Sequence, residues 1–141
     1  MFEHWKEVRK ALLEGVENLS QEQLDWKAEN AVNSVGDLLR HIADTLDWWF
    51  SEEIKDGGKF IELTQENCGD LERILKELNR SFERLIRYVE KNRDFDVVFE
   101  SSWGGKFTLN WALWHLFEHE VHHRGQIFMM LRMMGVELPQ I

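Results

Sequence analysis

Histidines are concentrated near the end of the chain, at a spacing that suits metal binding. Four of the six histidines lie within nine residues: His115, His119, His122 and His123. His119 and His123 are four residues apart, so on an α-helix they differ by about 40° in rotation and their imidazoles point the same way. Two such imidazoles can bind a divalent metal when a third ligand comes from elsewhere. A metal is therefore the first explanation to test.

His41 is the natural third ligand, because it is the only histidine in the second predicted helix, about residues 35–55. Three imidazoles leave a fourth coordination position for water or a substrate atom, as in catalytic zinc sites. We therefore expect His41, His119 and His123 to bind one divalent ion, and we place His115 and His122 outside the ligand set. The alternative is two buried, hydrogen-bonded histidines on the inward face of the last helix, but burying two polar rings without a shared partner is costly.

Two other metal motifs fit this segment only in part. The run from His119 to His123 matches H-E-x-x-H, in which Glu120 would be the general base of a zinc protease. Only 18 residues follow His123, too few for another ligand-bearing helix. Glu120 and His123 also match half of a di-iron bundle site, but the second pair is missing. Both alternatives are disfavoured.

The rest of the chain predicts the helices that must position these ligands. Apolar residues recur every three or four positions along residues 2–19, 35–55, 68–92 and 109–134, with a short helical turn near 21–26. Residues 93–107 break this period, and Gly104-Gly105 within them predicts a turn. The pattern predicts an all-α fold, a four-helix bundle, as a single domain over residues 1–141. The break at 93–107 is the best candidate for a loop that covers one end of the bundle.

The residues around the histidines resemble the DinB/YfiT-like four-helix bundles. The likeness rests on Leu-Leu-Arg-His41-Ile-Ala in the second helix and on His115-x-x-x-His119-x-x-x-His123-Arg-Gly-Gln in the last. It extends over nearly the whole chain and includes the segment Leu-Ser-Gln-Glu-Gln-Leu-Asp-Trp at residues 19–26.

This resemblance implies a divalent metal, often nickel or zinc, bound by His41, His119 and His123. It also implies a bundle with up-down-down-up topology that is frequently a dimer. Some members are thiol-S-transferases that use bacillithiol, mycothiol or glutathione, and others are thiol-dependent isomerases. The resemblance therefore adds a low-molecular-weight thiol to the cofactors that we consider.

Composition narrows the partners and the compartment. The net charge of −9 disfavours a nucleic-acid surface, which needs clustered Lys and Arg. The single cysteine, Cys68, excludes an intrachain disulfide. Neither a signal peptide nor an apolar run long enough to cross a membrane is visible, so we expect a cytoplasmic protein. The last helix is apolar around most of its circumference at 128–134, which predicts a homodimer face unless the C-terminal tail covers it.

Two functions remain open at this point. The first is a metal-dependent enzyme, such as a thiol-S-transferase or a hydrolase, that acts on a small molecule at an open three-histidine site. The second is a non-catalytic metal-binding protein or a dimeric interaction module of a stress response. A catalytic site needs a cavity open to solvent at the fourth position of the metal, whereas a structural site is closed by a fourth protein ligand.

Overall fold

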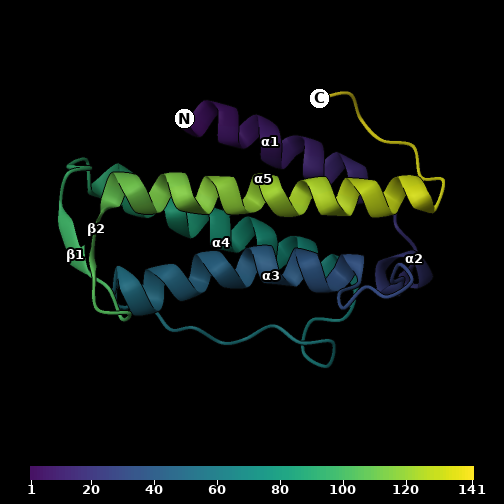
Figure 1. Cartoon of the computed structure of the whole chain (residues 1–141), viewed down its shortest axis with the longest axis horizontal. Helices are drawn as coiled ribbons and strands as arrows, with labels where there is room; N and C mark the ends of the chain where they lie inside the picture. The colour runs from purple at the N-terminus through teal and green to yellow at the C-terminus, as the bar shows by residue number, and fades with distance from the viewer.

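Four long helices dominate the computed structural model, which describes all residues, 1–141 (Figure 1). In chain order the elements are α1 Phe2–Val16, α2 Gln21–Asp25, α3 Val35–Trp48, the π-helix η1 Trp49–Glu53, α4 Leu71–Lys91, β1 Val98–Glu100, β2 Lys106–Thr108 and α5 Leu109–Met133. Helices α1 and α5 run in one direction, while α3 and α4 run in the other. The predicted four-helix bundle with up-down-down-up topology is therefore confirmed.

Side-chain caps explain where the helices begin. Ser34 accepts a hydrogen bond from the backbone N–H of Asp37, whose carboxylate accepts in turn from the N–H of Ser34, and the same reciprocal pattern starts α2. Thr108 caps α5 in the predicted place, through a 3.1 Å hydrogen bond from the N–H of Trp111. Helix α4 begins later than the predicted residue 68 because Asp70 is its cap.

The end of the second long helix differs from an ideal α-helix. The predicted range 35–55 is occupied by α3 and then by the π-helix η1. A π turn accommodates an extra residue, which changes which side chains face inward. Trp49 and Phe50, adjacent in sequence, are both buried there. Gly57 follows with φ of +95°, a conformation that favours glycine, and the helix does not continue.

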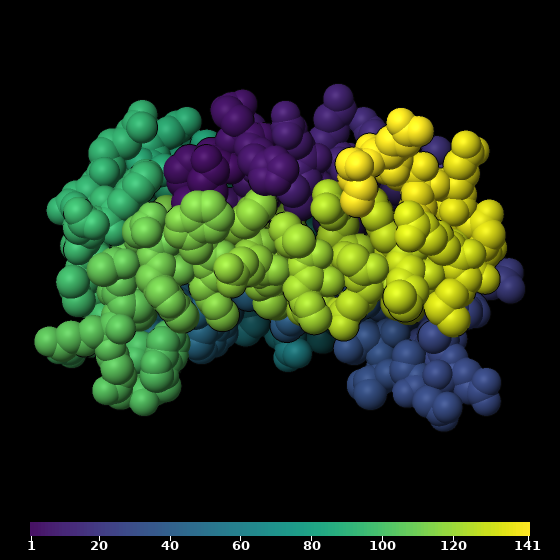
Figure 2. Space-filling view, turned by 45° about the horizontal axis from the view of Figure 1, so that its top comes forward, coloured from purple at the N-terminus to yellow at the C-terminus, as the bar shows by residue number.

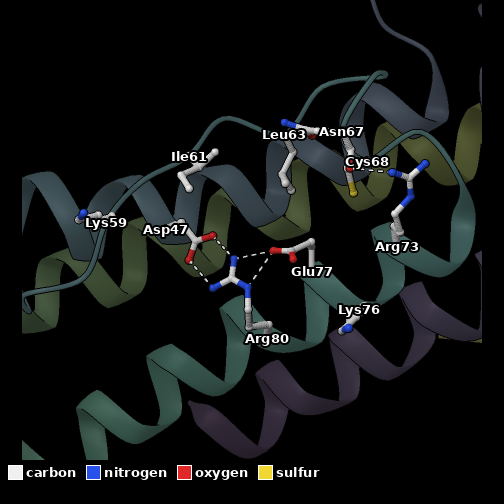
Figure 3. Close-up of a pocket in the computed structure, with 10 residues that line it drawn as sticks. All are labelled: Asp47, Lys59, Ile61, Leu63, Asn67, Cys68, Arg73, Lys76, Glu77 and Arg80. Atoms are coloured by element: carbon white, nitrogen blue, oxygen red, sulfur yellow. Dashed lines mark hydrogen bonds and ion pairs between the residues drawn. The ribbon is translucent and has the colours of Figure 1, made fainter.

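A long crossover, residues 54–70, connects the parallel helices α3 and α4 and packs on both. The backbone N–H of Leu63 donates to the carboxylate of Asp44 at 3.1 Å, and Arg40 donates to the carbonyl of Cys68 at 3.0 Å. Figure 3 shows the space beneath this crossover, about 520 Å³, where Arg80 joins Asp47 to α4. These contacts fix α3, the helix that carries His41, against its neighbour.

The apolar core consists of two clusters separated by a buried polar layer. One cluster surrounds Leu39 and Ile127, and the other surrounds Phe50 and Leu113. Between them on α1 and α5 lie Arg9 and Glu120, which form an ion pair. No buried side-chain polar atom in the protein lacks a hydrogen-bond partner, so the polar layer is fully paired.

A β-hairpin closes the end of the bundle, within and just beyond the predicted break at 93–107. Strands β1 and β2 are antiparallel, with Phe99 opposite Phe107. The ring of Phe107 packs 5.3 Å from that of Trp49, and this contact joins the hairpin to the end of α3. None of the helices combines the length and the apolar character that a membrane span requires.

The surplus apolar surface predicted at the end of α5 is mostly covered. Phe128, Met130 and Leu131 are buried, and the tail packs on the core through Val136 and Leu138. Met129 and Met133 stay 66% and 60% exposed. Folding back of the tail therefore accounts for part of the pattern, and two exposed methionines remain.

Candidate metal centre

The structure brings the three predicted ligands together between α3 and α5. One ring nitrogen from each of His41, His119 and His123 lies within 4.8 Å of the other two. The Nε2 atoms of His41 and His119 are 2.9 Å apart, and the ring centroids of His119 and His123 are 4.4 Å apart. The i, i+4 pair on α5 therefore meets a third imidazole from a different helix, as the spacing predicts.

These separations suit a tetrahedral divalent ion. Two nitrogens at 2.0–2.1 Å from such an ion lie about 3.3 Å apart, a value between the observed 2.9 Å contact and the 4.8 Å limit. Small side-chain rotations would therefore bring all three nitrogens to bonding distance. No carboxylate and no cysteine joins the cluster, so an ion held here would keep at least one position free of protein ligands.

Two polar side chains contact the imidazoles, and one of them, Gln126, orients a ring through the nitrogen that does not face the cluster. The Nδ1 atom of His123 lies 2.6 Å from Oε1 of Gln126, which leaves its Nε2 as the free ligand atom. The hydroxyl of Thr45 lies 3.4 Å from Nε2 of His119. Neither residue is among the predicted site residues. Gln126 was detectable, because it lies three residues after His123 on the same helix, whereas Thr45 requires the packing of α3 against α5.

Partial desolvation favours the neutral form of all three imidazoles. The pKa of His119 is lowered to about 3. Desolvation is the largest cause, and the charges of His123 and His41 act in the same direction. Desolvation also lowers the pKa values of His41 and of His123, although the hydrogen bond with Gln126 partly offsets the effect for His123. An imidazole must be neutral to bind a metal, so the cluster is in its ligating form at neutral pH.

The other two clustered histidines point elsewhere. The ring of His115 stacks on Trp111, with centroids 5.0 Å apart and an interplanar angle of 7°. His122 is exposed, and its ring lies beside that of His123 at 4.9 Å without joining the convergent group. Neither residue belongs to the convergent group.

The expected position of His119 and His123 on the inward face of α5 is wrong. His119 and His123 are only partly buried and His41 is exposed, whereas the inward face of α5 at this level carries Leu116 and Glu120. The inward face of α5 is rotated by one residue from the predicted one, so that Glu120 and not His119 points into the core. The carboxylate of Glu120 belongs to the buried polar layer. The three histidines consequently lie between two helices at the surface, where solvent reaches them.

Glu120 faces away from the histidines and into the core. Its carboxylate accepts two hydrogen bonds from Arg9, at 2.6 and 2.7 Å, and one from the indole of Trp5, at 2.8 Å. Its exposed fraction is 1%, so it is a buried core side chain. A carboxylate held in this way is not available as a general base, so the H-E-x-x-H match has no catalytic meaning here.

Other candidate groups lie outside the site. Asp44, one turn after His41, faces the crossover, where burial raises its pKa to about 6. Cys68 is buried beneath the crossover, and desolvation raises the pKa of its thiol. The cysteine is therefore a protonated core side chain.

Known proteins are similar to this chain in sequence or in fold. The chain is 28% identical over 140 residues to the uncharacterized protein YjoA of Bacillus subtilis (strain 168), an alignment that covers 96% of this chain and 90% of that protein. A crystal structure of a DinB-like protein from Bacillus cereus ATCC 10987 superposes with a TM-score of 0.80 at 18% identity, over 99% of this chain and 94% of the other. The DinB family model matches residues 1–141, and on this match the chain belongs to the DinB family.

Proposed function

We propose that this protein binds one divalent metal ion through His41, His119 and His123 and is a metal-dependent enzyme that acts on small molecules. The observation that carries the proposal is the convergence of three imidazole nitrogens within 4.8 Å of one another at a partly exposed position between α3 and α5. A closed structural site would add a fourth protein ligand, and none is present in this cluster. Membership of the DinB family supports the same interpretation.

A bound ion with an open position would supply a Lewis acid that holds a thiol as its thiolate or lowers the pKa of water. Thiol-S-transfer and hydrolysis are the two reactions that fit this chemistry. We favour thiol-S-transfer because the site supplies no nearby carboxylate to act as the base for an attacking water, Glu120 and Asp44 being bonded elsewhere. The thiol would itself be the second cofactor, and nickel or zinc suits a three-imidazole site.

Elemental analysis of untagged protein tests the metal. We expect about one equivalent of zinc or nickel in wild-type protein and none in a variant with His41, His119 and His123 all replaced by Ala. Activity is then tested by incubating metal-loaded protein with bacillithiol, mycothiol or glutathione and an electrophile. Metal binding without any turnover would favour the alternative, a non-catalytic metal-binding module.

We also propose that the chain forms a homodimer, as the exposed side chains of Met129 and Met133 suggest. The two residues are one helical turn apart on α5 and present apolar surface that one bundle does not use. Light scattering of wild-type protein should then give twice the monomer mass, and Met129→Lys together with Met133→Lys should restore the monomer. A wild-type monomer at high micromolar concentration contradicts the proposal.

A further inference from the structure

The cavity beneath the crossover is separate from the three-histidine site. Its volume is about 520 Å³, a size typical of small-molecule pockets, and its walls come from α3, the crossover and α4. Figure 2 shows the face of the molecule that α1, α5 and the C-terminal tail form, and none of the cavity residues belongs to these three elements. None of the three histidines lines the cavity, so any ligand bound there has a site of its own.

The charged side chains around this cavity are mostly positive, although the whole chain has a net charge of −9. Four of the six that line it are cations and two are carboxylates. Both carboxylates already have guanidinium partners: Asp47 pairs with Arg80 and Arg84, and Glu77 pairs with Arg80 (Figure 3). The carboxylates of the cavity are therefore neutralised, and its remaining cations are in excess.

These remaining cations have unused donors. The only lysine ion pairs in the protein are those of two lysines on α1, so Lys59 of the crossover and Lys76 of α4 have none. Arg73 donates to the carboxylate of Asp70 through Nε and to the carbonyl of Asn67 through Nη1, which leaves its Nη2 without an acceptor. An anion that enters the cavity would meet positive groups that no protein carboxylate occupies.

One wall of the cavity is apolar. Ile61 is 72% exposed and is the only large apolar side chain of the crossover that is exposed. Figure 3 shows it next to Leu63 along the crossover, and both side chains line the cavity. Covering exposed apolar surface is favourable by about 25 cal/mol per Å². The wall therefore favours a ligand that has an apolar part.

We infer that this cavity binds a small organic anion whose apolar chain or ring lies against Ile61 and Leu63 and whose negative group pairs with Lys59 and Lys76. An inorganic anion would leave the exposed isoleucine uncovered, and a neutral apolar molecule would leave the lysines unpaired. The inference goes beyond the proposed function, because the two sites share no residue.

Hexanoate is the probe, and the protein is first stripped of metal so that the carboxylate cannot bind an ion at the histidines. Cys68 lines the cavity and is the only cysteine, so labelling with nitrogen-15 cysteine gives one backbone amide signal beside the ligand. The movement of this signal during a titration measures the affinity. We expect hexanoate to bind roughly three- to tenfold more tightly than 1-hexanol, which lacks the charge, and roughly tenfold or more tightly than acetate, which lacks the chain.

Two substitutions separate the contributions of the walls. Lys59→Met combined with Lys76→Met should remove the advantage of hexanoate over hexanol, and Ile61→Ser should weaken hexanoate while leaving acetate unchanged. Lys91→Met is the matched control, because Lys91 is also an exposed lysine of α4 without an ion pair but lies outside the cavity. It should keep the preference for hexanoate.

Equal affinities of the wild type for hexanoate and hexanol, or an equal loss in Lys91→Met and in the double lysine variant, would overturn the inference. A Cys68 signal that does not move with hexanoate would overturn it as well. Replacement of all three histidines by Ala should leave hexanoate binding unchanged. Failure of the metal site and failure of this site are therefore distinguishable.

Discussion

His119 and Glu120 are neighbours in the sequence, yet they belong to two polar clusters with opposite properties. The Glu120 cluster is closed: its carboxylate is buried and accepts three hydrogen bonds from Arg9 and Trp5. The histidine cluster is open: its nitrogens converge on one another, and its side chains are exposed or only partly buried. Consecutive residues on an α-helix are separated by about 100° of rotation, so one helix serves both clusters.

The comparison separates stability from binding. A buried charge whose partners all come from the protein contributes to a defined fold, and breaking it leaves the remaining charge unpaired. The ligand nitrogens of the histidine cluster have weaker partners, each other and the 3.4 Å contact of His119 with Thr45, so they gain more from an incoming ion. We therefore expect substitutions in the histidine cluster to change metal binding and substitutions in the Glu120 cluster to change folding.

The largest effect is expected from the ligands themselves. His119→Ala should abolish tight metal binding because it removes one of three nitrogens, and the loss should exceed the roughly 10–100-fold that follows from removing an orienting partner. His122→Ala should bind as tightly as wild type, because its ring lies outside the convergent group. Calorimetric titration with zinc or nickel measures both. Wild-type affinity in His119→Ala would show that the proposed site is wrong.

Breaking the closed cluster should have the next largest effect, on folding. Glu120→Ala leaves the guanidinium of Arg9 buried and without its carboxylate, and it should lower the free energy of unfolding by about 3–5 kcal/mol. Urea denaturation followed by circular dichroism measures the change. Arg9→Met combined with Glu120→Leu removes both charges and should recover much of the loss. Folded Glu120→Ala should still bind metal, and loss of its metal binding would link the two clusters.

Gln126 provides a finer test of the open cluster. Because its side chain orients His123 through a 2.6 Å contact, Gln126→Ala should weaken metal binding by roughly 10–100-fold without removing a ligand. Stability of the metal-free protein should change little, since Gln126 is exposed. Gln126→Glu retains an acceptor oxygen and should bind more tightly than Gln126→Ala. Equal affinities for Gln126→Ala and wild type would exclude the orienting role.

The smallest expected effect is the pH dependence of the metal-free fold. The pKa of His119 is lowered to about 3, so between about pH 6.5 and pH 3 the unfolded chain binds a proton that the folded chain does not. The free energy of unfolding should therefore fall as the pH is lowered through this window. Asp44, whose pKa is raised to about 6, opposes the trend because its protonation favours the folded state.

Denaturant titrations at several pH values isolate the contribution of each group. His119→Gln should lose less stability than wild type between about pH 6.5 and pH 4, since glutamine does not titrate. Asp44→Asn should lose more than wild type over the same range, because the opposing contribution is gone. A slope in His119→Gln equal to that of wild type would remove His119 as its source.

Local patterns in the sequence were sufficient for the helices and for the identity of the clustered histidines. Caps such as Ser34 and Thr108 and the apolar period define where helices begin, since both depend on residues within one or two turns. The orientation of α5 was not predictable in this way. Its inward face includes a carboxylate, which is buried only when paired, and its partner Arg9 is 111 residues away in the sequence. Long-range pairing decided which side of α5 faces the core.

The separation between His41 and His119 has a consequence for how the chain folds. The two ligands are 78 residues apart, with the crossover, α4 and the hairpin between them. An ion bound to both would act as a reversible cross-link that closes a long loop, and such a link restricts the unfolded ensemble more than a link across a short loop. Because its ligands come from α3 and α5, the complete site exists only after these two helices have packed together.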